Sequence, residues 1–270
     1  MPKVAVGDLL VSYDEHGTGE PVLMINGIGA DRNGWGLQVP AISAEFRTIT
    51  FDNRDVGQTG PGSNQGTYAI RQFADDAAGL LAALGMDTAH IVGASMGGCI
   101  AQEFAISHPD RTRSATIICS WPRVDPWMAE LWEQWEHLFE AQGALEWNRT
   151  TWLWVFTHRA YRDPAFLKGL LTGTAANPNP QTLEMYLRQS HAAKTFDALD
   201  RLPEITAPVH VICGGEDIFT PRRYSEEIAA AISGAKLSVM PGVGHGMFWE
   251  STEAFNELVL EFIRDVQGIR

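Results

Sequence analysis

The stretch "AHIVGASMGGCIAQEF", residues 89–104, decides the fold of this chain. It begins as a short apolar run and continues, after a group of small residues, with apolar positions at helical spacing. Ser95 lies where the predicted strand turns sharply into the predicted helix. Such a turn strains its central residue and tolerates only small neighbours, a condition that Gly93, Gly97 and Gly98 satisfy. The turn also lifts the Ser95 hydroxyl to a helix N-terminus, where free N–H groups favour developing negative charge.

Outward from this turn, short apolar runs alternate with helical patterns along most of the chain. The runs that predict strands are residues 9–17, 21–27, 46–54, 89–93, 113–120, 207–217 and 236–242. The patterns that predict helices are residues 69–84, 97–107, 221–232 and 252–266. Strands that alternate with helices are typical of an α/β fold, with a mostly parallel twisted sheet and helices on both faces.

Residues 122–200 interrupt this alternation. Their pattern is helical except for a loop at "NPNPQ", and together with Trp121 at the border they hold seven of the nine tryptophans. We therefore predict a core domain of residues 1–121 and 201–270, and an inserted α-helical cap subdomain of residues 122–200. The cap aromatics either line a pocket over Ser95 or simply hold the cap against the core, and the sequence leaves both readings open.

Composition narrows the class of protein. The chain has 270 residues, 45% of them hydrophobic, which fits a globular protein with a sizeable core. A net charge of -13 argues against nucleic acid as a partner. We see no signal-peptide pattern and no apolar stretch of the ~20 residues that a membrane span needs. Three widely spaced cysteines without zinc spacing fit buried thiols in a reducing, cytoplasmic setting. We expect a monomer or homodimer.

A serine hydroxyl needs a base, and that base must itself be oriented. Downstream of Ser95, "VHVICGGEDIFTP" places Asp217 in the loop after a buried strand. "LSVMPGVGHGMFWE" places His245 in the loop after the last predicted strand, between two glycines. The order Ser95, Asp217, His245 is the chain order of the α/β-hydrolase triad.

Each of these residues also has a simpler interpretation. Ser95 could be an incidental serine in a tight turn, and His245 a structural loop histidine. Asp217 could cap the helix that Pro221 opens, and Glu216 is its close rival as the acid. Three independent matches in the right places favour the catalytic interpretation over these alternatives.

From about residue 20 to the C-terminus, the chain resembles the α/β-hydrolase family. Within that family it is most similar to small serine carboxylesterases and to the 3-oxoadipate enol-lactonase group. "DNRDVGQTG" resembles the family loop D-x-R-G-x-G-x-S, and "GGEDIFTP" and "GVGHGMFWE" resemble its acid and base loops. The resemblance implies that Ser95 is the nucleophile, that His245 is first the general base and then the acid, and that Asp217 orients the imidazole.

The resemblance also implies an oxyanion hole, formed by the backbone N–H groups of Ile28 and Met96. The family loop after the third strand usually reads H-G-x-x, and here it reads "NGIGAD". Asn26 therefore stands in place of a histidine; its amide could brace the loop or meet a substrate oxygen, and we favour bracing. In the second loop, Asp55 stands in place of the first glycine. We expect an ion pair of Arg54 and Asp52 to brace that loop.

These observations predict a serine hydrolase that cleaves carboxylic esters of small to medium apolar or aryl substrates through an acyl-enzyme, without metal or cofactor. The residues expected to line its substrate pocket are Asn26, Trp121, Trp154 and Phe248. A lactonase or enol-lactone hydrolase, a C–C bond hydrolase and a perhydrolase-type haloperoxidase would use the same residues. From a different class, a small-molecule binding protein on this fold remains an alternative.

Overall fold

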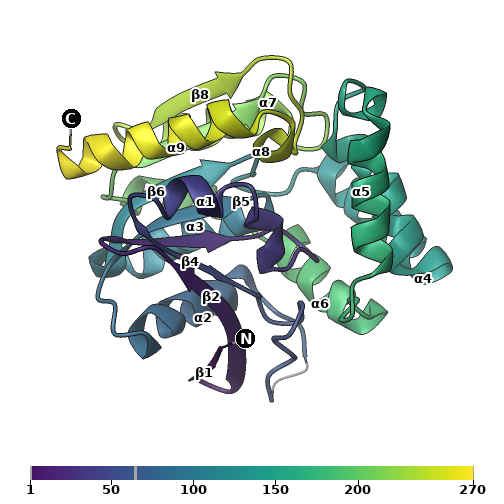
Figure 1. The fold of residues 1–270 in the computed structure, drawn as a ribbon, viewed down its shortest axis with the longest axis horizontal. Coiled ribbons are helices and arrows are strands. Elements are labelled where there is room, and N and C mark those ends of the chain that lie inside the picture. Colours follow the sequence, from purple (N-terminus) through teal and green to yellow (C-terminus); the bar gives the residue numbers. More distant parts are fainter. Residues whose placement is uncertain (1, 64–65, 270) are drawn as a thin grey trace.

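The computed structural model describes residues 2–63 and 66–269 and contains a single eight-stranded sheet (Figure 1). The strands are β1 (Lys3–Val6), β2 (Leu9–His16), β3 (Pro21–Ile25), β4 (Arg47–Phe51), β5 (Ala89–Ala94), β6 (Thr112–Ile118), β7 (Val209–Gly214) and β8 (Lys236–Met240). They lie in the order β1-β2-β4-β3-β5-β6-β7-β8. Strands β3 to β8 run parallel, and β1 and β2 are antiparallel to their neighbours. The predicted mostly parallel α/β sheet is confirmed.

Helices cover both faces of the sheet, because the buried strands are apolar on both sides. In β3, Leu23 and Ile25 belong to one buried cluster, and Val22 and Met24 belong to the other. The first face carries α2 (Ile70–Ala83), α3 (Met96–Ser107) and α7 (Arg222–Ala231). The second face carries α1 (Val39–Ile42) and α9 (Thr252–Gln267), and the short α8 (Met247–Glu250) precedes α9.

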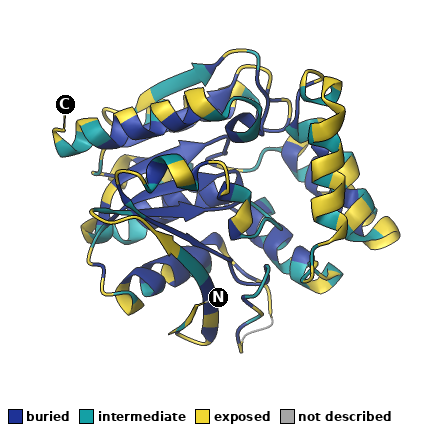
Figure 2. Ribbon diagram, in the orientation of Figure 1, coloured by how far each residue is buried: buried dark blue, intermediate teal, exposed yellow. Residues whose placement is uncertain are grey.

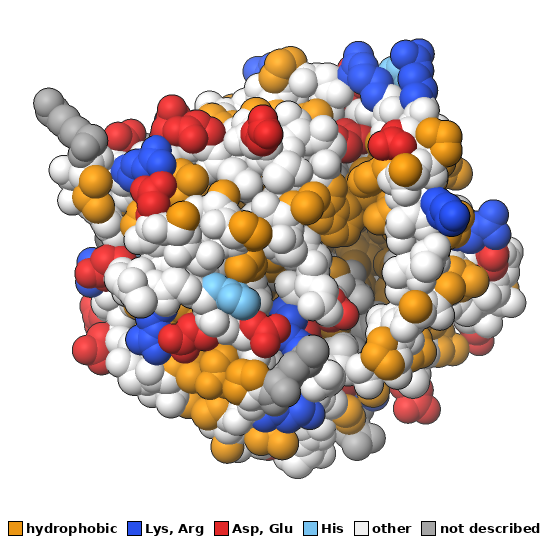
Figure 3. Space-filling model, viewed as in Figure 1, with side chains coloured by type: hydrophobic (Ala, Val, Ile, Leu, Met, Phe, Trp, Pro, Cys, Tyr) orange, Lys and Arg blue, Asp and Glu red, His pale blue; other side chains and the backbone are white. Residues whose placement is uncertain are grey.

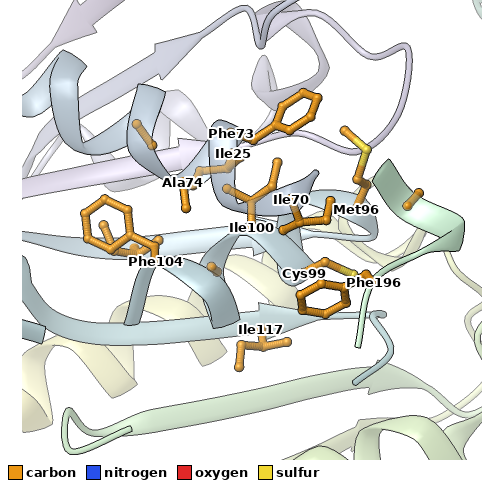
Figure 4. Close-up of a cluster of buried hydrophobic side chains, with 14 of the residues drawn as sticks. Ile25, Ile70, Phe73, Ala74, Met96, Cys99, Ile100, Phe104, Ile117 and Phe196 are labelled. Atoms are coloured by element: carbon orange, nitrogen blue, oxygen red, sulfur yellow. The ribbon is translucent and has the colours of Figure 1, made fainter. Parts of the chain in front are cut away.

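The larger cluster fixes α3 in place behind the turn at Ser95. Figure 4 shows Met96, Ile100 and Phe104 of α3 pointing into a packed layer with Phe73 of α2 and Ile25 of β3. All five side chains are almost wholly shielded from solvent. This packing sets the height and direction at which α3 leaves the sheet.

Between β6 and β7 the chain forms helices and, within this fully described segment, no strand. The α-helices of this segment are α4 (Pro126–Val155), which breaks at Gly143 with a φ of 77°, α5 (Pro164–Ala175) and α6 (Leu183–Lys194). An isolated antiparallel bridge between Arg123 and Asp197 brings the ends of the segment together. Figure 1 shows the three helices at one side of the sheet, and Figure 2 shows how exposed α5 is.

The edges of the sheet depart most from the sequence prediction. β1 was not predicted, since three of its four residues are at least partly exposed and the run is short.

The predicted helices at 69–84, 97–107, 221–232 and 252–266 correspond to α2, α3, α7 and α9 to within one residue at each end. Among the described residues, no helix is both long enough and apolar enough to span a membrane.

Candidate active site

The turn at Ser95 is the most constrained backbone of the site. Ser95 has φ 58° and ψ −122°, a conformation that side-chain-bearing residues rarely adopt. A Cβ added at Gly93 would lie 2.0 Å from the carbonyl oxygen of Gly97, and one added at Gly97 would lie 2.2 Å from that of Ile25. A Cβ at Gly98 would lie 2.5 Å from the Cβ of Ser120. The glycines predicted to permit this close approach are therefore sterically required.

The other predicted residues lie at the same edge of the sheet as Ser95. Asn26 follows β3, Asp217 follows β7 and His245 follows β8, so each stands just beyond the carboxyl end of a parallel strand. Parallel strands bring their carboxyl ends to one edge, where ligands of open α/β sheets bind. Residues more than 200 positions apart in the chain thus share one site.

Asp217 and His245 form a buried hydrogen-bonded pair. His245 Nδ1 lies 2.9 Å from Asp217 Oδ2, and both residues are more than nine-tenths buried. The hydroxyl of Thr220 donates to Asp217 Oδ2 at 2.6 Å and lies 3.0 Å from His245 Nδ1. The other carboxylate oxygen accepts from the backbone N–H groups of Phe219 and Thr220. Asp217 therefore braces the loop before α7 with one oxygen and orients the imidazole with the other.

Opposing effects act on the protonation of His245. Burial lowers its pKa, whereas the charge of the Asp217 carboxylate and hydrogen bonds to the side chains of Asp217 and Cys119 raise it. The net direction is upward, toward a more basic imidazole. The Phe219 ring packs on the imidazole with ring centres 4.7 Å apart and limits its movement.

A group of three potential metal ligands occurs at this pair. The ligand atoms of Cys119, Asp217 and His245 lie within 4.8 Å of one another, and all three residues are buried. His245 Nδ1, however, already faces the Asp217 carboxylate in a hydrogen bond. The arrangement is explained by an acid–imidazole pair with a buried thiol beside it, without recourse to a metal.

Ser95 and His245 both line one cavity, of about 150 Å³. Among the described residues, none hydrogen-bonds to the Ser95 hydroxyl. In unliganded sites such contacts are often longer than in the substrate complex. A Cβ added at Gly27 would lie 3.0 Å from Ser95 Cβ and 3.5 Å from Ser95 Oγ, so the side chain of Ser95 lies against the loop after β3.

The backbone around the Ser95 hydroxyl offers unpaired donors. Among the hydrogen bonds of the described residues, none uses the N–H of Ile28 or the N–H of Met96 as donor. Met96 is the first residue of α3, where N–H groups lack helical partners. Both groups are therefore available to an oxygen bound at Ser95.

Tryptophan and phenylalanine side chains form a large part of the cavity wall. Besides the loop after β3, the residues that line the cavity include Trp135, Trp147, Asn148, Thr151, Trp152, Val155, Phe219, Phe248 and Trp249. Figure 3 shows a hollow lined by hydrophobic side chains between the main body and the helices α4 and α5. Asn148 and Thr151 contribute an amide and a hydroxyl from α4 to this wall.

Two of the four residues predicted to line the pocket do so. Asn26 and Phe248 line the cavity, and Trp121 and Trp154 do not. Trp121 is fully buried against Trp132 and Phe219, because it closes the core beneath the site. Trp154 packs at an angle against Trp127 and edge-on against Trp135 on α4, and it is not among the residues that line the cavity. For these two tryptophans the prediction of pocket lining is corrected.

The loops after β3 and β4 are braced differently from the expected ion pair. Asn26 Nδ2 donates to the carbonyl oxygen of Asp31 at 2.6 Å, the loop-bracing contact that we favoured, while also lining the cavity. Arg54 pairs with Asp76 rather than with Asp52, at 2.6 Å and 2.7 Å. Asp52 instead pairs with Arg32, so the expected Arg54–Asp52 pair is wrong.

Asp55, which stands where the family loop usually has glycine, connects this loop to the helical insertion. Asp55 has a φ of 65°, which explains why glycine is usual at this position of the family loop. Its carboxylate is fully buried and accepts a hydrogen bond from Nε of Arg188, on α6, at 2.6 Å. The strained residue thereby joins the loop to the helical insertion.

Several residues of the site were missed from the sequence. Thr220 had a signal, since a hydroxyl three residues after an acid is common in capping turns. Trp135, Trp147 and Trp152 had none, because helical spacing does not say which side of α4 faces the core and which faces a cavity. Glu216, the rival acid, pairs with Arg159 at the surface.

A parallel sheet with a strained serine turn after β5, and an acid and a histidine after β7 and β8, defines the α/β-hydrolase class. A sequence profile of the alpha/beta hydrolase fold matches residues 20–252, and the chain belongs to this family. It is 28% identical over 268 residues to the "Putative carbamate hydrolase RutD" of Azorhizobium caulinodans, covering 98% of this chain and 99% of that protein.

Two further relatives show the breadth of the family. The 2-hydroxy-6-oxo-6-phenylhexa-2,4-dienoate hydrolase of Comamonas testosteroni is 30% identical over 276 residues, covering 96% of this chain and 93% of that protein. The crystal structure of the enol-lactonase from Burkholderia xenovorans LB400 superposes with a TM-score of 0.88 at 26% identity, covering 97% of this chain and 99% of that chain. The relatives named here are hydrolases that act on different substrates.

Proposed function

We propose that the chain is a serine hydrolase that cleaves carboxylic esters through an acyl-enzyme. The observation that carries the proposal is the His245–Asp217 hydrogen bond of 2.9 Å at the wall of the cavity that also holds Ser95. An oriented imidazole that shares a cavity with a serine on a strained turn is the arrangement that activates a hydroxyl.

The proposed reaction follows from these positions. His245 takes the proton of the Ser95 hydroxyl as its oxygen attacks the ester carbonyl. The N–H groups of Ile28 and Met96 hold the oxygen of the tetrahedral intermediate, as negative charge develops there. His245 then protonates the leaving alcohol and later removes a proton from the water that releases the acid. Asp217 stabilises the imidazolium in both steps.

Cavity size and lining support a compact acyl group. An apolar cavity of about 150 Å³ in another protein accommodates a benzene molecule. The cavity of this chain has a similar volume and an aromatic wall, which suits an acyl group of about one ring or a short branched alkyl chain. Residues 122–200, which supply α4 to that wall, act in this proposal as the cap of a core formed by residues 1–121 and 201–270.

A panel of p-nitrophenyl esters and lactones, with Ser95→Ala as control, tests the proposal. We expect the highest turnover on esters with short or monocyclic acyl groups, and loss of that turnover in Ser95→Ala. A fluorophosphonate probe should label the folded wild type at Ser95. Absence of both labelling and turnover would instead favour a small-molecule binding protein.

A lactonase is the second candidate, because the superposition with the Burkholderia xenovorans enol-lactonase covers almost the whole chain. It would use the same nucleophile, base and donors, but the leaving alcohol would stay attached to the acyl group. Higher turnover on lactones than on every open-chain ester in the panel would replace the esterase proposal with this one.

A further inference from the structure

One side chain of the helical insertion reaches the loop that follows β3. Gln189 of α6 is fully buried, and its Oε1 accepts the backbone N–H of Gly29 at 3.0 Å. Its Nε2 donates to the carbonyl oxygen of Arg54, in the loop after β4, at 2.7 Å. A single amide thus joins α6 to two loops that lie more than 130 residues earlier in the chain.

The Gly29 N–H belongs to a turn that has a competing form. Residues 27–30 are closed by a hydrogen bond from Ala30 N to Gly27 O at 3.4 Å, and Gly29 has a φ of 67°. Ile28 does not have a positive φ, so the turn is of type II, with Ile28 at its second position. The commoner type I form would rotate the peptide between Ile28 and Gly29. That rotation would turn the Ile28 carbonyl oxygen toward Gln189 Oε1, placing two acceptors face to face.

The amide of Gln189 is itself held in one orientation. Gln181 Nε2 donates to Gln189 Oε1 at 3.0 Å and to the Asp55 carbonyl oxygen at 3.1 Å. Arg188 pairs with the buried Asp55 carboxylate. Because the Arg54 carbonyl requires a donor and Gly29 requires an acceptor, only one placement of the Gln189 amide satisfies all its neighbours. The acceptor that faces Gly29 is therefore fixed.

We propose that Gln189 is a positioning residue for the oxyanion hole: its amide accepts the N–H of Gly29 and thereby fixes the turn at residues 27–30, which carries the Ile28 N–H beside Ser95. This inference rests on the proposed serine hydrolase function. It means that docking of α6 against the core sets the rate of the chemical step and not only the shape of the pocket. A misplacement of about 1 Å at such a donor commonly costs on the order of 100-fold in rate.

The test compares three variants on the best p-nitrophenyl ester of the panel. Gln189→Met removes both hydrogen bonds at similar length, and Gln189→Glu keeps an acceptor for Gly29. Ser190→Ala is the matched control, since Ser190 is equally buried on α6 but its hydroxyl bonds to Glu136 at 2.6 Å and not to the loop. We measure kcat, KM, Tm and the inhibition constant of phenylboronic acid, whose tetrahedral adduct with serine places an oxygen in the hole.

We expect Gln189→Met to lower kcat roughly 10- to 100-fold with little change in KM. The inhibition constant of phenylboronic acid should rise by a similar factor. Gln189→Glu should retain more of kcat than Gln189→Met, and Ser190→Ala should keep wild-type kcat. Equal kcat in Gln189→Met and Ser190→Ala, or a loss confined to Tm, would overturn the inference. If Gln189→Met does not fold, Gln189→Glu decides: a lower kcat together with weaker inhibition by phenylboronic acid would support the inference, and wild-type kcat, or a loss of kcat without weaker inhibition, would overturn it. A wild type whose turnover does not depend on Ser95 would overturn the proposed function itself.

Discussion

At the scale of single residues, the two carboxylate oxygens of Asp217 have different hydrogen-bond partners. Asp217 holds its own loop with Oδ1 and the imidazole with Oδ2, but it does not cap α7, whose N-cap residue Pro221 is met by no side-chain capping bond. The sequence placed Ser95, Asp217 and His245 correctly at one edge of the sheet, because each directly follows a strand. It could not place Gln189, whose partners depend on how the insertion docks.

Thr220→Val tests the role of the hydroxyl beside the pair. The substitution keeps the side-chain shape but removes the hydrogen bond of 2.6 Å to Asp217. We expect a stability loss of roughly 1.5–3 kcal/mol, as for hydrogen bonds to charged groups, and a decrease in kcat of about tenfold. Urea unfolding and ester kinetics measure the two effects.

Thr116→Val serves as the matched control for that variant. Thr116 is buried, and its hydroxyl has no hydrogen-bond partner among the described residues. Removal of this hydroxyl should leave the free energy of unfolding unchanged or raise it slightly, and it should leave kcat unchanged. Similar kinetics for Thr220→Val and Thr116→Val would contradict a role for the Thr220 hydroxyl in orienting the pair.

Asp217→Asn tests the electrostatic role of the acid. With the carboxylate present, the pKa of His245 lies above its usual range, so kcat/KM should rise with pH as the imidazole loses its proton. Replacement by the neutral amide removes the carboxylate charge that raises this pKa, so the inflection should move to lower pH. We also expect kcat to decrease by about 10⁴-fold, since the amide favours the wrong tautomer. An unmoved inflection would show that Asp217 does not set the charge of His245.

At the scale of elements, the turn between β5 and α3 accounts for why the sequence was informative. A strand, a turn of small residues and a helix leave a local pattern, and the bounds of α3 follow from it to within one residue. The tryptophans of α4 leave no comparable pattern, because burial in a core and burial at a cavity need the same side chains. Only packing decides that Trp135 lines the cavity and Trp154 does not.

Gly97→Ala tests how tight the turn is. The added methyl would lie 2.2 Å from a backbone oxygen of β3, which cannot move without distorting the sheet. We expect a loss of several kcal/mol or insoluble protein, because overpacking against backbone allows no relief. Gly173→Ala on α5 is the control; nothing lies within 4 Å of the added methyl, and it should stabilise the helix by roughly 0.5–1 kcal/mol. Thermal denaturation measures the Tm of both variants. A soluble Gly97→Ala protein with wild-type Tm would refute a tightly packed turn.

At the scale of the whole molecule, two buried histidines link stability to pH. Burial lowers the pKa of His90 in β5 and of His210 in β7 to about 4. The unfolded chain binds protons at both positions as pH falls below about 6.5, whereas the folded chain does not until about pH 4. Stability should therefore be fully present above pH 6.5 and should fall toward pH 4, by roughly 3 kcal/mol for each histidine.

Urea unfolding at pH 7 and pH 5 measures this dependence. His210→Gln should reduce the difference in unfolding free energy between the two pH values. His16→Gln, at an exposed position in β2, is the matched control and should leave that difference unchanged. Equal pH dependence in the wild type and His210→Gln would rule out His210 as a source of acid sensitivity.

The exposure of α5 has a consequence for how this protein can diversify. Its twelve residues include none that is buried, yet Gly169, Leu170 and Gly173 border a groove that shares Trp152 and Trp249 with the cavity wall. Changes there can alter which small molecules enter the groove without disturbing the sheet. Selection can therefore act on substrate preference in a part of the chain where mutations cost little folding energy, while the chemistry is inherited intact.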